Sequence, residues 1–97
     1  MGFFDFLKQP DINQGIKDYE SSSSAVLLDV RTPQEYRQGR IPESRNLPLQ
    51  NIDTAEEAVK DKDTPLFVYC YSGARSRQAV NRLQKMGYTN VTNIAGI

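Results

Sequence analysis

The segment from Pro65 to Gly87 constrains this chain most, because a tight loop there joins a short apolar run to a helical repeat. Residues 66–69 are apolar or aromatic and lead into Cys70, the only cysteine. Beyond the loop, apolar residues recur with the spacing of a helix that has one buried face. They are Ala79, Val80, Leu83 and Met86. The segment predicts strand, loop and helix, with Gly87 as a left-handed C-cap and the thiol at the carboxyl end of the strand, where ligands bind in open α/β sheets.

The loop after Cys70 has the features that lower the pKa of a thiol. A loop that turns into a helix N-terminus directs backbone N–H groups inward and adds the positive end of the helix dipole. Arg75 and Arg77 add positive charge. Such surroundings bring a cysteine from a pKa of about 8.5 to about 3.5–7.5. The same amides would bind an oxyanion, and Gly73 suits a turn with positive φ.

Each of these residues also has a purely structural interpretation. A free cysteine that ends a strand is often a small buried hydrophobic residue. Arg75 and Arg77 would then be solvated charges on the helix. Ser72 and Ser76 are able to bind sulfur or an oxyanion, but a serine placed like Ser72 commonly caps a helix. The combination of the short loop, Arg75 and the following helix favours a reactive thiol.

The sequence Cys-Tyr-Ser-Gly-Ala-Arg-Ser at residues 70–76 resembles the active-site loop of the rhodanese family of sulfurtransferases. Three other segments resemble landmarks of that family in the same order. They are Leu27–Tyr36 with the following Gly39–Pro42, Asn46–Pro48, and Asn93–Ile97. Two segments depart from the family pattern: residues 40–45 lack the usual histidine and Gly-Ala, and Ala95 replaces the first glycine of a Gly-Gly turn. The resemblance covers roughly residues 25–97.

The resemblance implies a three-layer α/β domain, with a mainly parallel sheet of four or five strands and helices on both faces. It implies a thiosulfate sulfurtransferase in which Cys70 takes a sulfur from a small anionic donor and passes it, as a persulfide, to cyanide, a thiol or a protein acceptor. The loop residues would hold the persulfide and the oxyanion, with Arg75 supplying charge. They are Tyr71, Ser72, Gly73, Ala74, Arg75 and Ser76. No metal or organic cofactor is implied.

Two other functions stay open. Relatives that hydrolyse phosphate esters or reduce arsenate share this scaffold, but their loop is one residue longer than the six residues from Cys70 to Arg75. The other alternative is a module that binds partners without catalysis, although such relatives commonly lack the cysteine. The short loop and Cys70 both favour sulfur transfer.

Composition sets further limits. The 97 residues predict one domain, residues 1–97, with a modest core. The net charge of zero gives no attraction to nucleic acid or to an anionic membrane, although every charged side chain after Asp63 is basic. The absence of histidine excludes a His-ligated metal and a Cys-His couple. No segment is suited to spanning a membrane, and a lone reactive thiol fits the reducing cytoplasm. We expect a monomer or weak dimer.

The ends of the chain lead to two further expectations. Residues 1–10 include three phenylalanines and are expected to form an apolar arm that either covers the core or contacts a partner. At the other end the chain stops at Ile97, where the rhodanese family usually continues. The C-terminal end is short by comparison, and we expect either that the sequence is cut short there or that the arm or a second copy closes the domain.

Local patterns predict the remaining elements. Asp11 is expected to cap a short helix, and residues 25–30 to form a strand buried on both faces. Asp29 and Arg31 would organise the turn after that strand. Two capping boxes open short helices, one at residues 32–35 that ends at Gly39 and one at residues 54–57 that runs to about Lys60. Residues 46–49 would form a short edge strand, and residues 91–94 the last strand.

Overall fold

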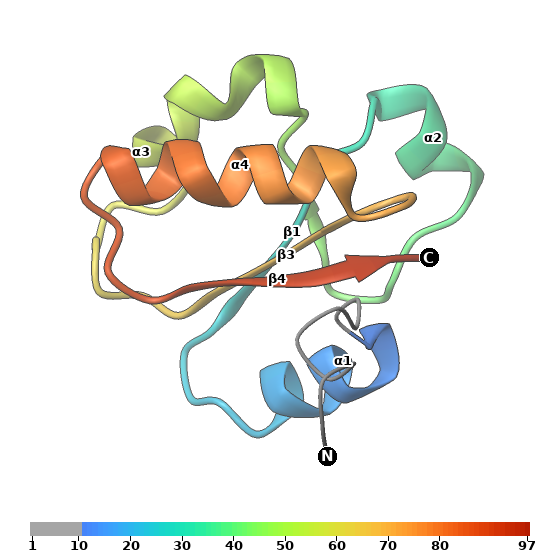
Figure 1. Cartoon of the computed structure of the whole chain (residues 1–97), viewed down its shortest axis with the longest axis horizontal. Helices are drawn as coiled ribbons and strands as arrows, with labels where there is room; N and C mark the ends of the chain where they lie inside the picture. Colours follow the sequence, from blue (N-terminus) through green and yellow to red (C-terminus); the bar gives the residue numbers. More distant parts are fainter. Residues whose placement is uncertain (1–10) are drawn as a thin grey trace, which may run out of the picture.

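The computed structural model describes residues 11–97, which form a four-stranded parallel sheet with helices on both faces (Figure 1). The strand order is β2-β1-β3-β4. The strands are β1 (Val26–Asp29), β2 (Arg45–Asn46), β3 (Leu66–Cys70) and β4 (Val91–Gly96). The predicted three-layer α/β class is confirmed, with every pairing parallel. The apolar arm predicted for residues 1–10 lies outside the described residues.

The central strands β1 and β3 are short apolar runs covered on both faces, as parallel strands require. All five residues of β3 are buried, and Leu28 of β1 lies opposite Val68 of β3. β2 and β4 form the two edges. The central position of β3 places Cys70, its last residue, in the middle of the carboxyl edge of the sheet.

Two helical layers enclose the sheet. One face packs against α4 (Ala74–Lys85), α3 (Ala55–Ala58) and the 3₁₀ helix η2 (Leu49–Thr54) through the larger hydrophobic cluster. The other face packs against α1 (Ile12–Glu20) through a smaller cluster. Its buried members are Leu27, Phe67, Tyr69 and Ile94. Figure 1 shows α1 on the opposite side of the sheet from α3 and α4. Within residues 11–97, no helix combines the length and hydrophobicity needed to cross a bilayer.

The N-terminal caps of two helices are confirmed. The Asp11 carboxylate accepts a hydrogen bond from the Asn13 amide at 2.9 Å, which caps α1. Helix α2 (Pro33–Gln38) opens with the predicted capping box between Thr32 and Glu35, and it ends at Gly39. Both caps depend only on residues within four positions of each other, which is why the sequence predicts them well.

The prediction of a second capping box, at residues 54–57, is wrong. The Thr54 side chain makes no capping bond, and its hydroxyl donates to the Asn51 carbonyl at 2.8 Å. Thr54 already closes the 3₁₀ helix η2, so its backbone has ψ of 9° rather than the extended conformation that an N-cap requires. Helix α3 is correspondingly short and ends at Ala58, not at about Lys60.

The edge strand predicted at residues 46–49 is short, as expected, but begins one residue earlier as β2. The backbone beyond it still follows β1, because the Leu47 amide donates to the Asp29 carbonyl and the Leu49 amide donates to the Val30 carbonyl. Pro48 lies between these two amides and has no N–H to donate. The last predicted strand, residues 91–94, is two residues longer in the structure.

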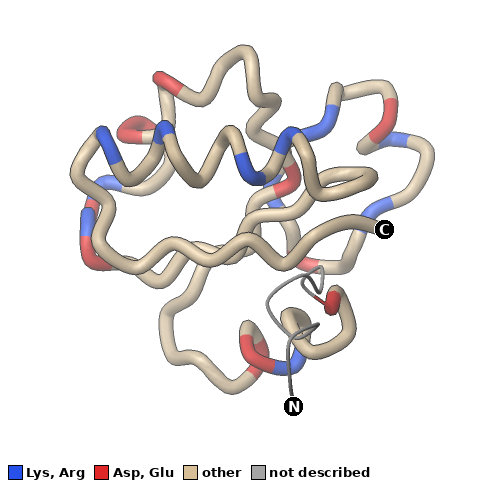
Figure 2. Tube along the Cα trace, viewed as in Figure 1, with Lys and Arg blue, Asp and Glu red and all other residues tan. Residues whose placement is uncertain are grey.

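Helix α4 begins at Ala74, directly after Gly73. It ends at Lys85, and Gly87 beyond the Met86 cap has φ of +104°, which confirms the predicted left-handed residue at the helix end. Basic residues lie along this helix, as the blue segments of Figure 2 show. Two of them are paired: Arg82 contacts Asp53 at 2.5 Å and Arg75 contacts Glu35 at 2.7 Å. These pairs offset part of the positive charge of the C-terminal third.

Candidate active site

Cys70 lies at the junction of β3 and α4, and the backbone of residues 71–76 curves around its sulfur. Its side chain is buried, with 1% of the residue exposed. The Gly73 amide donates to Cys70 Sγ at 2.9 Å and the Ser76 amide donates to it at 3.4 Å. The sulfur is therefore buried, but the neighbouring amides point toward it. This is the geometry of a cradle for a negative charge.

Opposing effects act on the pKa of the Cys70 thiol, and the outcome is a pKa below the ordinary value. Burial is the largest effect, and it raises the pKa because it disfavours the thiolate. The hydrogen bond between the sulfur and the Ser76 side chain lowers the pKa, as do the bonds from the amides of Ser76, Gly73 and Ser72, and together they outweigh burial. Short-range hydrogen bonds lower the pKa of this thiol more than the charge of Arg75, which also interacts with Cys70.

Two glycines shape this loop, which we call the Cys70 loop (residues 70–76). Gly73 has φ of +97°, as predicted, and directly precedes the first turn of α4. At Gly96, a Cβ atom would lie 2.0 Å from the Tyr71 carbonyl oxygen. The end of β4 thus packs directly on the loop backbone, where the Ile97 amide donates to the Cys70 carbonyl at 3.1 Å.

Ser76 connects the loop to β4. Its hydroxyl oxygen lies 3.5 Å from Cys70 Sγ, 3.0 Å from the Gly73 carbonyl and 2.7 Å from Asn93 Oδ1. Ser76 is fully buried. Asn93 is missing from the predicted site residues. The available signal was its place on the last strand, because the carboxyl ends of parallel strands converge at one edge of the sheet.

Arg75 forms a bidentate ion pair with Glu35 of α2. Its Nη1 and Nη2 lie 2.7 and 3.1 Å from the two carboxylate oxygens. The bonds from Arg75 are the main reason that the pKa of Glu35 falls to about 2, and the bonds from Glu35 raise the pKa of Arg75. Glu35 is a second residue that the predicted site lacks. Arg77 is exposed, as its interpretation as a solvated helix charge predicted.

The other predicted loop residues take different positions. Tyr71 is 65% exposed and Ser72 is exposed. Gly73, rather than Ser72, is the N-cap of α4, so the alternative role of Ser72 as a helix cap is wrong. The Ser72 amide nevertheless faces the sulfur closely enough to lower the pKa of Cys70. Ala74 begins the helix.

A buried ion pair supports the turn beside the loop. Asp29 is fully buried, and Arg31 is 5% exposed. Arg31 Nη2 lies 2.7 Å from Asp29 Oδ2 and donates to the Gly39 carbonyl at 2.6 Å. With the carboxylate and the guanidinium both engaged in this turn, the structural role predicted for the two residues is confirmed.

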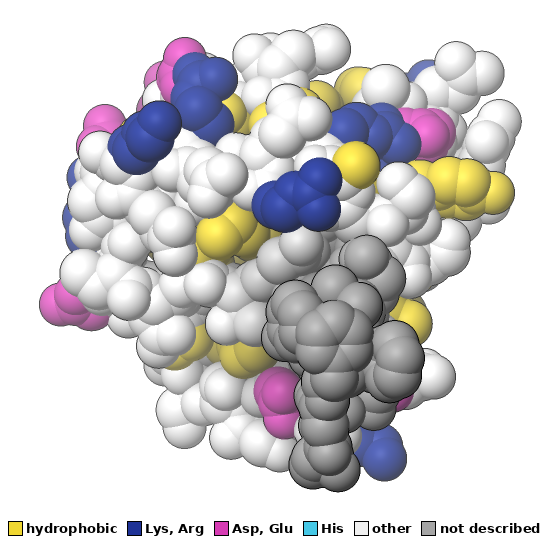
Figure 3. All heavy atoms as spheres, viewed as in Figure 1, with side chains coloured by type: hydrophobic (Ala, Val, Ile, Leu, Met, Phe, Trp, Pro, Cys, Tyr) yellow, Lys and Arg dark blue, Asp and Glu magenta, His cyan; other side chains and the backbone are white. Residues whose placement is uncertain are grey.

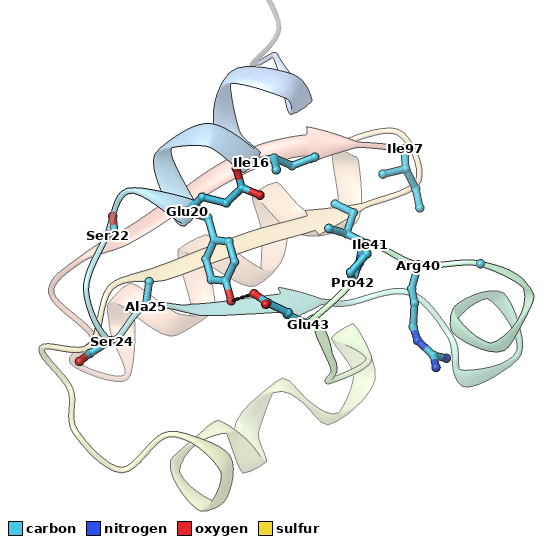
Figure 4. Close-up of a pocket in the computed structure, with 12 residues that line it drawn as sticks. Ile16, Glu20, Ser22, Ser24, Ala25, Arg40, Ile41, Pro42, Glu43 and Ile97 are labelled. Carbon is cyan, nitrogen blue, oxygen red and sulfur yellow. Dashed lines mark hydrogen bonds between the residues drawn. The ribbon is translucent and has the colours of Figure 1, made fainter.

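Two hollows lie near this edge of the sheet. The smaller, about 440 Å³, adjoins the Cys70 loop. Its lining residues are Arg31, Glu35, Gln38, Gly39, Tyr71 and Ile97. The larger, about 950 Å³, runs between α1 and residues 39–43 on the other face of the sheet, and Cys70 is not among its lining residues (Figure 4). Cys70 does not line the smaller hollow either, and of the loop residues only Tyr71 reaches it.

The surface around α4 carries separate positive side chains rather than one continuous basic patch, as Figure 3 shows for the face in view. Among residues 11–97, no three His, Cys, Asp or Glu side chains are grouped so that they could hold a metal ion. What the site offers is a single acidified thiol with inward-facing amides. It is suited to nucleophilic chemistry on a small anionic substrate.

Fold and site together define a parallel α/β domain that holds a thiol at the N-terminus of a helix. The chain belongs to the rhodanese-like domain family, whose model matches residues 11–96. It is 41% identical to a sulfurtransferase of Allochromatium vinosum, over 88% of this chain and 76% of the relative. It is 39% identical to the thiosulfate sulfurtransferase PspE of Escherichia coli, over 72% of this chain and 68% of that protein.

Solved structures show the same similarity. A rhodanese from Escherichia coli, solved with anions, superposes with a TM-score of 0.71 at 38% identity, covering 74% of this chain and 86% of that one. The human single-domain sulfurtransferase TSTD1 superposes with a TM-score of 0.75 at 25% identity, covering 92% of this chain and 91% of the other.

Proposed function

We propose that this protein is a thiosulfate sulfurtransferase that carries a sulfane sulfur as a persulfide on Cys70. The observation that carries the proposal is the position of Cys70 Sγ, 2.9 Å from the Gly73 amide and 3.4 Å from the Ser76 amide, with a lowered pKa. Similarity to known proteins supports the proposal, because the chain is 41% identical to a sulfurtransferase and 39% identical to a thiosulfate sulfurtransferase.

The reaction has two half-reactions. The Cys70 thiolate attacks the outer sulfur of thiosulfate, so that a bond forms between Sγ and that sulfur. The bond between the two thiosulfate sulfurs breaks, and its electron pair leaves with sulfite. A nucleophilic acceptor, either cyanide or a thiolate, then attacks the terminal sulfur, and Cys70 leaves as the thiolate. Such a cycle has ping-pong kinetics.

The backbone of the Cys70 loop supplies the donors for this cycle. The amides that now point at Sγ would stabilise the persulfide anion and the departing sulfite, because fixed amides interact strongly with developing charge in a site shielded from water. Arg75 is the proposed source of positive charge. Since Glu35 binds its guanidinium in this structure, Arg75 would act from that fixed position beside the loop.

The test is the intact mass of the protein after it is mixed with thiosulfate. We expect a gain of one sulfur atom that cyanide removes as thiocyanate, and no gain in Cys70→Ser. A gain that persists in Cys70→Ser would overturn the assignment. Hydrolysis of an aryl phosphate or reduction of arsenate, with no sulfur uptake, would instead favour the alternative chemistry of the scaffold. Binding of a partner without any turnover would favour a non-catalytic module.

The setting of the reaction is part of the same proposal. A lone reactive thiol without a second cysteine suits a reducing compartment, and we place the protein in the cytoplasm as a monomer or weak dimer. The acceptor is a small thiol or a protein thiol that reaches the hollow beside Tyr71. No nucleic acid or membrane takes part. Sedimentation at two protein concentrations tests the assembly state.

A further inference from the structure

The hydroxyl group of Ser76 has one proton and lies near three atoms that could accept it. It is fully buried between the sulfur of Cys70, the carbonyl of Gly73 and the side chain of Asn93. A serine hydroxyl has one proton to donate. Of the three neighbours, Asn93 Oδ1 is the nearest at 2.7 Å, whereas Cys70 Sγ lies 3.5 Å away. Which neighbour receives the proton decides whether the hydroxyl supports a thiolate.

The backbone determines how the Asn93 amide is oriented. The Ala95 amide is 2.9 Å from Asn93 Oδ1, and because an N–H group only donates, the atom that faces it must be the oxygen. On the other side, Asn93 Nδ2 lies 3.4 Å from the Gly73 carbonyl, which only accepts. The atom in contact with Ser76 is therefore an acceptor, and the hydroxyl proton points toward β4.

We infer that Asn93 is a positioning residue that competes with the Cys70 sulfur for the proton of the Ser76 hydroxyl. With the proton on the Asn93 side, the Ser76 oxygen is free to accept a bond from the neutral Cys70 thiol. A thiolate has no proton to give and needs a donor, so the hydroxyl must turn away from its shorter bond. Asn93 thus limits the fraction of Cys70 that is ionised at neutral pH.

Other groups act on the same thiol but leave this competition unchanged. Tyr69 lies next to Cys70 on β3. The remaining charged groups around it are Arg75 and Arg77 at the start of α4, Glu35 of α2, and the buried pair of Asp29 and Arg31. β4 contributes no ionisable side chain. Because Asn93 is neutral, it acts on Cys70 through its contacts, which are Ser76 at 2.7 Å and the Gly73 carbonyl at 3.4 Å, and a Ser76→Ala background separates the two.

In the catalytic cycle, the competition applies whenever Sγ carries the charge, which is before sulfur is taken up and again when Cys70 leaves as the thiolate. Once a terminal sulfur is attached, Sγ carries no charge, and the hydroxyl is able to return to Asn93. That consequence rests on the proposed function, whereas the pKa of Cys70 does not. The experiment therefore measures the pKa directly and leaves sulfur transfer to a separate assay.

The test is the rate at which iodoacetamide alkylates Cys70, followed against pH in the full chain. Asn93→Leu has a similar shape and no acceptor, so the hydroxyl loses its nearest acceptor and is left with the Gly73 carbonyl and the sulfur. We expect the pKa of Cys70 to fall by about half a unit to one unit. In a Ser76→Ala background, the same substitution should leave the pKa unchanged. An unchanged pKa in Asn93→Leu alone, or equal falls in both backgrounds, would overturn the inference.

A second variant covers the case in which leucine disturbs the loop. Asn93→Asp retains an oxygen for the Ala95 amide and accepts more strongly from Ser76. Its charge raises the pKa of Cys70 in any background, but the rise should be larger with Ser76 present than with Ser76→Ala. Equal rises would contradict the inference. A chain that shows this dependence but takes no sulfur from thiosulfate would overturn the proposed function and leave the role of Asn93 intact.

Discussion

Glu35 joins helix α2 to the Cys70 loop through one carboxylate. The amide and hydroxyl of Thr32 donate to its Oε1, and the guanidinium of Arg75 binds both of its oxygens. These bonds favour the ionised form and hold the pKa of Glu35 at about 2, with Arg75 as the main cause. A side chain that belongs to a helix cap thus also determines where an arginine of the loop is placed.

The first prediction concerns the pH dependence of stability. Glu35→Gln keeps an acceptor for Thr32 but loses the charge, so the ion pair with Arg75 is weakened. Because the pKa of Glu35 is lower in the folded state, its stabilisation is complete above about pH 4.5 and is lost as the pH falls toward 2. The pair is one-third exposed, which limits the effect to about 1 kcal/mol at pH 7.

Urea unfolding of both proteins at pH 7 and near pH 2.5 measures this difference. Arg77→Ala is a matched control for the loss of one charge near the loop, because Arg77 is exposed. A difference between Glu35→Gln and the parent that stays equal at both pH values would show that the contribution comes from packing and not from the charge.

At the scale of elements, two similar threonine motifs differ in whether the threonine caps the helix that follows it. Thr32 has an extended backbone with ψ of 157°, and its hydroxyl accepts from the Glu35 amide at 3.2 Å. Thr54 ends a 3₁₀ helix with ψ of 9°, and its hydroxyl turns back to Asn51. The preceding backbone, and not the motif itself, decides whether a threonine caps the helix that follows.

The second prediction compares these two threonines. We expect Thr32→Ala to lower the free energy of unfolding by about 1 kcal/mol, since it removes an N-cap and an anchor of Glu35. Thr54→Ala should change it by less than about 0.5 kcal/mol, since the lost hydrogen bond is exposed. Thermal unfolding of the two variants under the same conditions measures both effects. Equal losses would show that Thr54 does cap α3.

At the scale of the whole molecule, the site depends on three strand ends meeting at one edge of the sheet. β3 supplies Cys70, the end of β1 and the turn after it supply the buried Asp29–Arg31 pair, and β4 supplies Asn93 and Gly96. Gly96 lies against the Tyr71 carbonyl so closely that any side chain would displace the loop. The shape of the cradle is therefore set by β4 as much as by the loop itself.

The last prediction tests this packing. Gly96→Ala should push residues 71 and 72 away from β4, lower the stability by about 1–3 kcal/mol and sharply reduce sulfur uptake from thiosulfate. Gly39→Ala is the control, because a Cβ atom there would meet nothing within 4 Å and its φ of 162° is ordinary extended backbone. The mass gain with thiosulfate and the unfolding midpoint are the measurements. Full sulfur uptake in Gly96→Ala would contradict the proposed packing.

The sequence by itself determined the order of most elements and the position of Cys70 between a strand and a helix. The capping box at Thr32 and the left-handed glycines at 73 and 87 were equally predictable. All of these depend on contacts between residues close in the chain or on an apolar pattern with a fixed period. That information is local, so it is present before the chain folds.

Only the tertiary structure decided what each side chain of the site touches. Arg75 was predicted to supply charge to the loop, but it binds Glu35, which is 40 residues away. Ser76 was predicted to bind sulfur or an oxyanion. Its oxygen does lie 3.5 Å from Cys70 Sγ, but its nearest partner is Asn93, 17 residues away on an edge strand. Such partners are chosen when the carboxyl ends of β1, β3 and β4 are brought together. No periodicity in the sequence encodes that convergence, because it depends on how the strands pair in the sheet.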